Sequence, residues 1–483
     1  MKDYKKLGLK AGLEIHQQLD TGKLFSNSPS YLRSDKPDYI IKRKLHAVAG
    51  ESGKIDIAAA HEASKKKEFF YEGYNDTISL VELDEEPPRN INEDSLEVAL
   101  QIALLMNCEV YPVTQIMRKT VIDGSNTSGF QRTVMVAHEG YIETSFGKVE
   151  IESICLEEDS ARIINREKNK ATFRLDRLGI PLVEITTAPV MYHPEEVKEA
   201  ALKIGEILRA CRVKRGIGTI RQDVNVSIKG HDRVEIKGFQ NPKMMVKTID
   251  LEIERQLGGI KKKEKEGSVR NALPDGETEF LRPIPGQSRM YPETDLELLK
   301  FSRDKINRLK KKLPKLREEL KSLLKKKGLS EELIKLVLEG NFEEFEVLIK
   351  VYNKDANLVA KMISLWRNEF SKKLNKDIGE IKTSLSERIL EKILLEVKEN
   401  KIEIGDVKEV MSRIVEGKIF EDAIKIEKLD DNKIEEEIRK IVKEKPGMRP
   451  NAYMGLVMAK FKGKVDAKKA MEILNRIFSN SNS

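Results

Sequence analysis

The sequence predicts an α+β protein in which strands come first and helices follow. Up to about Asp295, short segments rich in Val and Ile alternate apolar with polar residues and are interrupted by Gly, Pro, Asn and Asp. From Glu297 to about Lys401 the chain is dense in Lys, Leu and Glu at helical spacing. The last helical stretch, residues 402–483, is short enough to form a separate helical bundle. We therefore predict three domains, residues 1–296, 297–401 and 402–483.

Two helices and one loop stand out within the strand-rich part. Residues 95–106 are amphipathic, and residues 195–210 follow His193-Pro194, with proline placed where helices commonly begin. Residues 258–267 consist mainly of Gly, Lys and Glu, so we expect an exposed loop there.

Composition narrows the class of protein. The chain has 483 residues, 35% of them charged and 39% hydrophobic, with a formal net charge of +8. This basic excess is mild, and Lys-rich proteins without a nucleic-acid partner often match it. The N-terminus lacks the apolar run of a signal peptide, no apolar stretch could span a bilayer, and the three cysteines form no CxxC motif. We expect a cytosolic protein without a membrane partner.

Carboxylates recur on the polar faces of the predicted strands. Residues two apart on a strand share a face, so Glu14 lies with His16, and Glu184 lies with Thr186. In the same way, one face of residues 223–228 carries Asp223, Asn225 and Ser227, and the opposite face carries Val224, Val226 and Ile228. Glu235 shares a face with Lys237. A further acidic run is Glu157-Glu158-Asp159.

These residue types indicate a site for a hard cation. Oxygen donors with a single imidazole suit Mg²⁺ or Mn²⁺, and such ions assist phosphoryl transfer. For any one strand alone, a solvated face is the simpler explanation. The sequence contains no P-loop, protein-kinase signature or GxSxG motif.

Eight short segments, in a fixed order along nearly the whole chain, carry a resemblance to a known enzyme family. They are GLEIHQQLDTGKLFS (12–26), YNDTISLVELDEEPP (74–88), the Glu157-Glu158-Asp159 run, DRLGIPLVEITTAP (176–189), RQDVNVSI (221–228), EIKGFQNP (235–242), RMYPETD (289–295) and GLVMAKFKGKVD (455–466). Together they resemble the B and E subunits of glutamyl-tRNA(Gln) amidotransferases, and the E subunits more closely.

The resemblance implies an architecture and a reaction. It implies an antiparallel-sheet cradle domain that holds the active site, then a helical domain and a helical tail that binds tRNA. The implied reaction converts glutamyl-tRNA(Gln) to glutaminyl-tRNA(Gln) with ATP and Mg²⁺, by phosphorylation of the glutamate γ-carboxylate and attack by ammonia. By motif position, His16, Glu158 and Glu184 are the implied catalytic Mg²⁺ ligands, and Glu14 and Asp223 the implied ligands of a second divalent cation.

Four basic residues are implied contacts to the nucleotide phosphates or the substrate carboxylate. They are Arg118, Lys119, Lys237 and Arg289. Without the resemblance, each would be interpreted as an ordinary surface charge.

Two features of the family are missing from this sequence. The cysteine-rich zinc site common in B subunits is absent, and so is the large inserted domain common in E subunits. Residues 258–269 stand in the place of that domain, which leaves a natural short form or a removed domain as the alternatives. No amidase or asparaginase motif is present, so the resemblance implies that an asparaginase-like partner (GatD) supplies the ammonia.

Three alternatives concern the substrate and its contacts. The chain could be a non-catalytic tRNA-binding adapter that keeps the fold, although an adapter has no need for cation ligands. It could also accept aspartyl-tRNA(Asn) as a second substrate. We expect no DNA partner. The clustered Lys460, Lys462 and Lys464 suit either a solvated helix end or a surface that contacts RNA phosphates.

Overall fold

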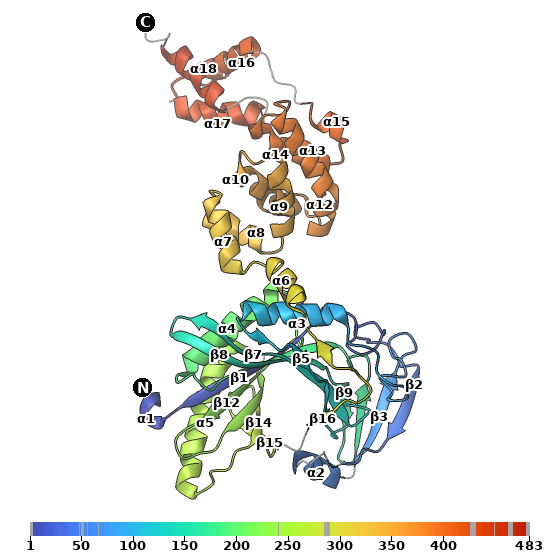
Figure 1. Ribbon diagram of the computed structural model, residues 1–483. Coiled ribbons are helices and arrows are strands. Elements are labelled where there is room, and N and C mark those ends of the chain that lie inside the picture. The colour runs from blue at the N-terminus through green and yellow to red at the C-terminus, as the bar shows by residue number, and fades with distance from the viewer. Residues whose placement is uncertain are drawn as a thin grey trace. The chain divides into compact units, whose positions relative to one another are not determined.

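The computed structural model confirms the α+β class, with a large, mainly antiparallel sheet followed by helices (Figure 1). It describes residues 3–47, 49, 53–55, 57–65, 67–239, 241–284, 290–425, 431–448, 450–461 and 467–479. Contacts divide the chain into two units, Met1–Leu316 and Arg317–Ser483.

The main sheet of the first unit has eleven strands among the described residues. Its order is β15-β14-β13-β12-β1-β11-β8-β7-β6-β16, and β4 pairs with β7. All of these pairs are antiparallel except β13 with β14. The strands are β1 (Lys10–Gln18), β4 (Glu109–Val110), β6 (Met117–Thr120), β7 (Phe130–Thr144), β8 (Gly147–Glu158), β11 (Pro181–Thr187), β12 (Ile220–Ser227), β13 (Val234–Phe239), β14 (Val269–Ala272), β15 (Thr278–Arg282) and β16 (Met290–Pro292).

Helices cover one face of this sheet and bury its apolar side chains. They are α3 (Glu93–Leu105), α4 (Pro194–Ala210) and α5 (Pro242–Lys262), which share one apolar core with the central strands (Figure 1). The Asn92 side chain accepts a hydrogen bond from Ser95 N at the start of α3, and Pro194 opens α4. The helices α3 and α4 match the two predicted ones, and the opposite face of the sheet is left for polar residues.

The predicted loop at 258–267 is wrong in its first half. The helix α5 continues through both glycines to Lys262, because Leu257 and Ile260 pack against the core. Beyond it, Asp232 N donates to Lys265 O at 2.9 Å, and Glu235 N donates to Ser268 O at 3.0 Å. A short hydrogen-bonded connection therefore leads from α5 to β14.

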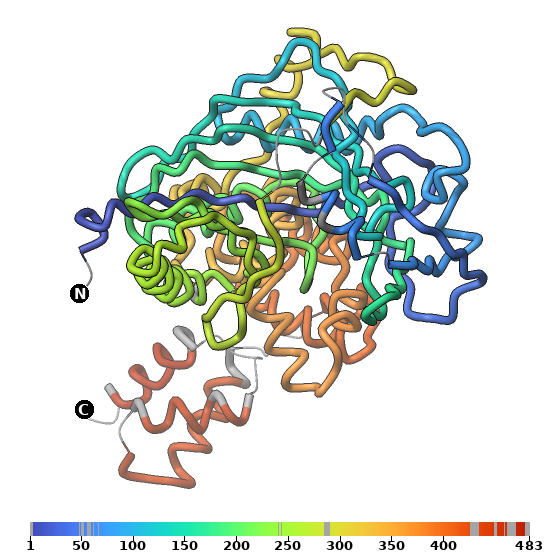
Figure 2. The backbone as a smooth tube through the Cα atoms, turned by 90° about the horizontal axis from the view of Figure 1, so that it is seen from below, coloured from blue at the N-terminus to red at the C-terminus, as the bar shows by residue number. Residues whose placement is uncertain are grey.

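Smaller elements complete the first unit. A four-stranded sheet, β2-β3-β10-β9, has its own apolar core, and β5 pairs with β17. In Figure 2 the segment of β2 and β3 lies at the end of this unit opposite to α5. The bounds are α1 (Tyr4–Leu7), β2 (Tyr39–Arg43), α2 (Ile57–Ser64), β3 (Glu68–Gly73), β5 (Val113–Thr114), β9 (Arg162–Arg166), β10 (Lys170–Arg174), β17 (Leu299–Lys300) and α6 (Arg303–Lys311).

The second unit is helical, and its described residues form two apolar cores, one from Leu324 to Ala423 and one from Ile434 to Ile477. Phe301 and Leu309 belong instead to the core of the first unit, so the contacts divide the chain after Leu316, later than residue 296. The three predicted domains remain a prediction. The helices are α7 (Arg317–Lys326), α8 (Glu331–Leu338), α9 (Phe342–Val351), α10 (Ala356–Ala360), η2 (Lys361–Leu365), α11 (Trp366–Leu374), α12 (Ile378–Ser384), α13 (Glu387–Lys398), η3 (Ile404–Asp406), α14 (Val407–Val415), α15 (Phe420–Ala423), α16 (Asp431–Glu444), α17 (Pro450–Phe461) and α18 (Ala467–Ser479).

None of the described helices combines the length and the apolar composition that crossing a lipid bilayer would require.

Candidate functional site

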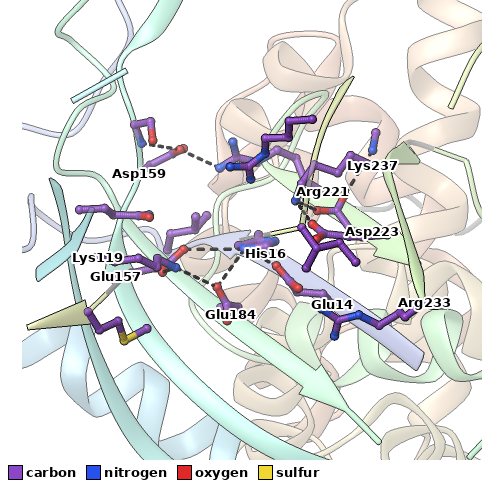
Figure 3. Close-up of a pocket in the computed structure, with 18 residues that line it drawn as sticks. Glu14, His16, Lys119, Glu157, Asp159, Glu184, Arg221, Asp223, Arg233 and Lys237 are labelled. Carbon is purple, nitrogen blue, oxygen red and sulfur yellow. Dashed lines mark hydrogen bonds and ion pairs between the residues drawn. The ribbon is translucent and has the colours of Figure 1, made fainter. Parts of the chain in front are cut away.

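A cavity of about 720 Å³ is lined by side chains from the polar face of the main sheet (Figure 3). Leu13 and Ile15 point into the core, so the alternation of β1 turns Glu14 and His16 into the cavity. The charged residues and the histidine that line it are Glu14, His16, Lys119, Glu157, Asp159, Glu184, Arg221, Asp223, Arg233, Glu235, Lys237 and Arg282.

The register of three neighbouring strands brings these side chains together. His16 lies opposite Glu184 of β11 on one side and opposite Arg221 of β12 on the other. Glu14 lies opposite Asp223 in the same way. Directly opposed residues of an antiparallel pair share a face and lie within side-chain reach of one another. Residues from distant parts of the sequence therefore meet at one site.

His16 stands at the centre of the acidic residues. Its Nε2 atom lies 3.2 Å from Glu184 Oε2, 3.5 Å from Glu14 Oε1 and 3.7 Å from Glu157 Oε1 (Figure 3). Among the described residues, two groups have potential ligand atoms within 4.8 Å of one another: His16 with Glu157 and Glu184, and His16 with Glu14 and Asp223. The donor set, carboxylate oxygens with one imidazole, fits a divalent cation such as Mg²⁺ or Mn²⁺.

The pKa values reflect an excess of negative charge. Burial disfavours the charged imidazole of His16, but the hydrogen bond and charge of Glu184 outweigh burial and raise its pKa to about 9. Burial, with the nearby charge of Glu184, raises the pKa of Glu14 to about 7. Burial also opposes ionisation of Glu184, yet Lys119 and His16 prevail and hold its pKa well below the usual range. The ionisation of these groups is thus set by one another, and protonated His16 is itself a counter-charge to the carboxylates around it.

Two lysines bridge the carboxylates. Lys119 Nζ lies 2.6 Å from Glu157 Oε2 and 3.4 Å from Glu184 Oε2. Lys237 Nζ donates to Asp223 Oδ2 at 2.8 Å and also pairs with Glu235. We call these residues together the cavity cluster; it consists of Glu14, His16, Lys119, Glu157, Glu184, Asp223, Glu235 and Lys237. Its five carboxylates are accompanied by two lysines and by His16, whose raised pKa keeps it cationic near neutral pH, and three arginines also line the cavity. A bound cation would take the place of some of these charges at the carboxylates around His16.

Asp159 is buried at the edge of the cavity and holds Arg221. Its Oδ1 accepts hydrogen bonds from Arg221 NH2 at 2.7 Å and from Ser160 N at 2.8 Å, and its Oδ2 accepts one from Gln18 Nε2 at 2.6 Å. Burial opposes ionisation, but the charges of Arg221 and Arg177 outweigh it and lower the pKa of Asp159. The carboxylate therefore fixes Arg221 at the wall of the cavity.

The structure brings two of the three implied ligands together and places the third, Glu158, elsewhere. His16 and Glu184 converge, but Glu157 lies beside them in place of Glu158. Glu158 points to the other face of the sheet, where its Oε2 accepts from Arg132 N at 3.2 Å and Arg132 NH1 at 3.3 Å. The cause is the alternation of β8, in which Glu158 follows the buried side of the strand and Glu157 follows the cavity side.

Arg118 is also turned away from the cavity. It forms a bidentate ion pair with Glu293, at 2.5 and 2.9 Å, and its guanidinium lies over the ring of Phe130. We call the charges on this side the rear cluster; it consists of Lys23, Glu82, Arg118, Arg132, Glu158 and Glu293. Of the other implied contacts, Lys119 and Lys237 line the cavity, whereas Arg289 lies outside the described residues.

Several lining residues were absent from the predicted set. These are Glu157, Asp159, Arg221, Arg233, Glu235 and Arg282. The sequence held a signal for Glu157: Ile154 and Leu156 are apolar residues two apart, so Glu158 continues the core face of that strand and Glu157 the other face. It held no comparable signal for Asp159 or Arg282, because each lies where two distant segments meet.

Comparison with known proteins gives consistent results. The sequence profile described as the GatB/GatE catalytic domain matches residues 9–307, which contain the whole cavity cluster. The chain is 36% identical to a Methanocaldococcus jannaschii protein named as the E subunit of glutamyl-tRNA(Gln) amidotransferase, over 98% of this chain and 99% of that protein. Relatives with the same name in Methanococcus maripaludis and Thermococcus gammatolerans are 34% and 32% identical, over 96% and 98% of this chain and 97% and 98% of those proteins.

These alignments are longer than the chain. The alignment with the Methanocaldococcus jannaschii protein runs over 627 positions, although this chain has only 483 residues. The relative therefore carries internal residues that this chain lacks, while both proteins are covered almost from end to end. A missing internal segment was the expectation from the sequence.

Proposed function

This chain belongs to the GatB/GatE family, and on that premise we propose that it amidates glutamate attached to tRNA(Gln), using ATP and ammonia. The observation that carries the proposal is the cavity cluster, in which three carboxylates lie 3.2–3.7 Å from His16 Nε2 and offer ligand atoms to a divalent cation. Relatives that align along nearly the whole chain are named as one of the subunits of glutamyl-tRNA(Gln) amidotransferase.

The residues that would hold a divalent cation are His16, Glu157 and Glu184. Glu14 and Asp223 would hold a second one without His16, because a neutral imidazole has a single lone pair to donate. A bound cation would neutralise phosphoryl oxygens and so assist their transfer. Glu158 takes no part in this set, because it faces Arg132 on the other side of the sheet.

The proposed chemistry explains why a carboxylate substrate needs such a site. An oxygen of the substrate γ-carboxylate attacks the terminal phosphorus of ATP, and ADP leaves. Ammonia then attacks the activated carbon, phosphate leaves with the electrons of the carbon–oxygen bond, and the nitrogen loses a proton. Negative charge gathers on phosphoryl oxygens throughout, so preorganised cationic side chains around the cavity stabilise it.

The cavity supplies such cationic groups. Arg221, Arg233 and Arg282 line it, together with Lys119 and Lys237. Arginine binds phosphate or carboxylate oxygens through two parallel hydrogen bonds. Arg221 is the best oriented of the three, since buried Asp159 fixes its guanidinium. We assign Arg221 to the anionic part of the substrate or the nucleotide.

Ammonia and tRNA need further contacts. The sequence shows no amidase motif, so we propose that an asparaginase-like partner (GatD) supplies ammonia to this chain. We propose that the helical tail binds tRNA. Lys460 of α17 pairs with Glu437 at 2.8 Å, whereas Lys462 and Lys464 lie outside the described residues.

The test is a direct assay of the isolated chain. The full chain is incubated with glutamyl-tRNA(Gln), ATP, Mg²⁺ and ammonium, and the amino acid released from the tRNA is identified. We expect glutamine with free ammonium, but none when asparagine or glutamine is the only nitrogen source. Glu184→Gln should abolish the product, and Lys42→Met, a change in the small sheet, should not.

Two results would contradict the proposal. A chain that binds glutamyl-tRNA(Gln) but forms no product with free ammonium would be a non-catalytic adapter. Product formed from asparagine or glutamine by the chain alone would reveal an amidase site within it. A parallel assay with aspartyl-tRNA(Asn) defines the range of tRNA substrates.

A further inference from the structure

Lys119 occupies the space between two of the candidate cation ligands. Its Nζ atom lies 2.6 Å from Glu157 Oε2 and 3.4 Å from Glu184 Oε2 (Figure 3). Glu157 and Glu184 are the two carboxylates that form a ligand group with His16. The carboxylates of Glu157 and Glu184 therefore contact the ammonium group of Lys119 and are also candidate ligands of a metal ion.

The side chain of Lys119 reaches this position from a distance. It starts on β6, opposite Gln131 of β7, and extends past that strand to Glu157 of β8 and Glu184 of β11. The side chain is 12% exposed at the cavity wall, and its four-carbon stem has several rotatable bonds. A change of stem rotamers can therefore move the ammonium group away from the carboxylates without movement of the sheet.

An ammonium group and a divalent cation compete for these carboxylates. A Mg²⁺ ion takes its ligand oxygens at roughly 2.0–2.1 Å, so it would lie within a few ångströms of the present Nζ position. Two unit charges about 4 Å apart repel by about 4 kcal/mol near a protein surface, and a doubly charged ion repels more strongly. This repulsion disfavours a state in which both cations share the same two carboxylates, and the cation with the greater charge prevails.

We propose that Lys119 is a displaceable counter-ion of the cation site. In the absence of metal, its ammonium group bridges Glu157 and Glu184. A divalent cation takes that place, and the released ammonium group turns into the cavity, where it binds phosphoryl oxygens of the nucleotide. The inference rests on the proposed function, because it takes the acidic group around His16 to be the site of the cation.

The proposal has a consequence for the order of binding. Before the cation binds, Lys119 is neutralised by its carboxylate partners and offers little attraction to a polyphosphate. After the cation binds, the net charge of the cavity rises by two, and the ion neutralises the two carboxylates in place of the lysine. Metal loading thus makes the cavity more attractive to an anionic substrate.

Lys237 provides the internal comparison. It bridges Asp223 and Glu235 as Lys119 bridges Glu157 and Glu184, so each lysine neutralises a different pair of carboxylates in the cavity. If the cation instead occupied the group of Glu14, His16 and Asp223, Lys237 would be the lysine displaced. Replacing each lysine in turn therefore distinguishes the two positions.

The experiment measures Mn²⁺ binding to the full chain without nucleotide or tRNA. Free Mn²⁺ is quantified by electron paramagnetic resonance in wild type, Lys119→Met, Lys237→Met and Lys42→Met. Removing the competing ammonium group should tighten Mn²⁺ binding by about tenfold or more in Lys119→Met. Lys42 pairs with Glu68 at 2.8 Å in the small sheet, so Lys42→Met should bind Mn²⁺ as the wild type does.

Each outcome decides between the inference and the function on which it rests. Tighter binding in Lys119→Met supports the inference, whether or not Lys237→Met also binds more tightly through the second cation position. Unchanged or weaker binding in that variant overturns it, as does tighter binding in Lys237→Met alone, and in both cases the proposed function stands if the wild type binds Mn²⁺. No Mn²⁺ binding by wild type or any variant would instead remove the cation site and the proposed function with it.

A second measurement on the wild type does not depend on a variant that folds. Acetylation of lysines by a small reagent is followed by mass spectrometry with and without Mn²⁺. Release from Glu157 and Glu184 should make Lys119 react faster when Mn²⁺ is present, while Lys42 reacts at the same rate. A Lys119 rate that Mn²⁺ leaves unchanged or slows would show a fixed structural ion pair and overturn the inference.

Discussion

The two faces of the main sheet differ in how their carboxylates are paired with cations. On the rear face, Glu82, Glu158 and Glu293 meet an equal number of cations, Lys23, Arg118 and Arg132. Among the described residues, the five carboxylates of the cavity cluster share two lysines and His16, and the three arginines of the cavity wall lie beside them without an ion pair to any of the five. The contrast begins within one acidic run, because Glu157 faces the cavity and Glu158, its neighbour, faces the rear.

The difference separates structural charge from binding charge. Buried ions are tolerated where a partner matches each one and hydrogen bonds satisfy the remaining atoms. The rear cluster meets this condition and connects β6, β7, β8 and the segment around Glu293. Burial raises the pKa of Glu158 as well as that of Glu14, so the pKa values alone do not separate the clusters. The cavity cluster differs because its carboxylates converge on one imidazole at an accessible wall. Carboxylates that converge at an accessible cavity wall can bind a cation from solution.

The largest effect should follow from breaking the rear cluster at Arg132. Arg132→Met leaves Glu158 and part of Glu293 buried without their partner, which should cost about 3–5 kcal/mol of stability. Hydrogen exchange of the β7 and β8 amides measures this loss locally. Arg43→Met breaks the more exposed pair with Glu85 and should cost at most about 1 kcal/mol. Equal losses in both variants would mean that the rear cluster is not a structural network.

The next prediction compares variants in which one of two neighbouring glutamates, Glu157 or Glu158, is replaced. Glu157→Gln removes a ligand charge from the cavity and should weaken Mn²⁺ binding by about 100-fold, which is about 2.7 kcal/mol. Glu158→Gln should leave Mn²⁺ affinity within about threefold of wild type but lower stability by about 1–3 kcal/mol, since Arg132 loses its charged acceptor. Titration with Mn²⁺ and thermal unfolding of both variants supply the two readouts. The reverse pattern would restore Glu158 as the ligand.

Much of this arrangement could be predicted from sequence, and the exceptions have physical causes. Alternation in β1 and β11 placed His16 and Glu184 on polar faces, and the antiparallel register then joined them. Glu157 lies beside His16 where Glu158 was expected, because a motif position was carried over without regard to which face of the strand each residue occupies. The role of Asp159 depends on Gln18 and Arg221, which are close only in the folded chain. The end of α5 was predicted to be a loop because it contains two adjacent glycines. The contacts of Leu257 and Ile260 with the core, which keep it helical, exist only in the folded chain.

A smaller effect should appear in the pH dependence of the metal-free protein. The pKa of Glu14 is raised to about 7 and that of His16 to about 9, so both groups favour the protonated folded state. Stability from such groups is present at low pH and is lost as pH rises through the folded pKa. In a chelator, the unfolding temperature should therefore fall by a few degrees between pH 5 and pH 9.

Mn²⁺ and Glu14→Gln provide the controls for that pH dependence. Saturating Mn²⁺ should flatten the curve, because the ion replaces the protons as counter-charge. Glu14→Gln should flatten only its lower part, since Glu14 titrates near pH 7 and His16 near pH 9. A metal-free protein whose unfolding temperature rises over this interval would show that the cavity carboxylates are not in excess.

The smallest predicted effect concerns Asp159, the third member of the acidic run, which belongs to neither cluster. Asp159→Asn keeps the shape of the side chain but weakens its hold on Arg221, so the KM for the anionic substrate should rise by about tenfold, with a smaller change in kcat. Arg221→Gln should give a similar rise. Because Asp159 acts on substrate through Arg221, the double variant should be no worse than Arg221→Gln alone. Effects that add in the double variant, or a loss confined to kcat, would show that Asp159 has a role independent of Arg221.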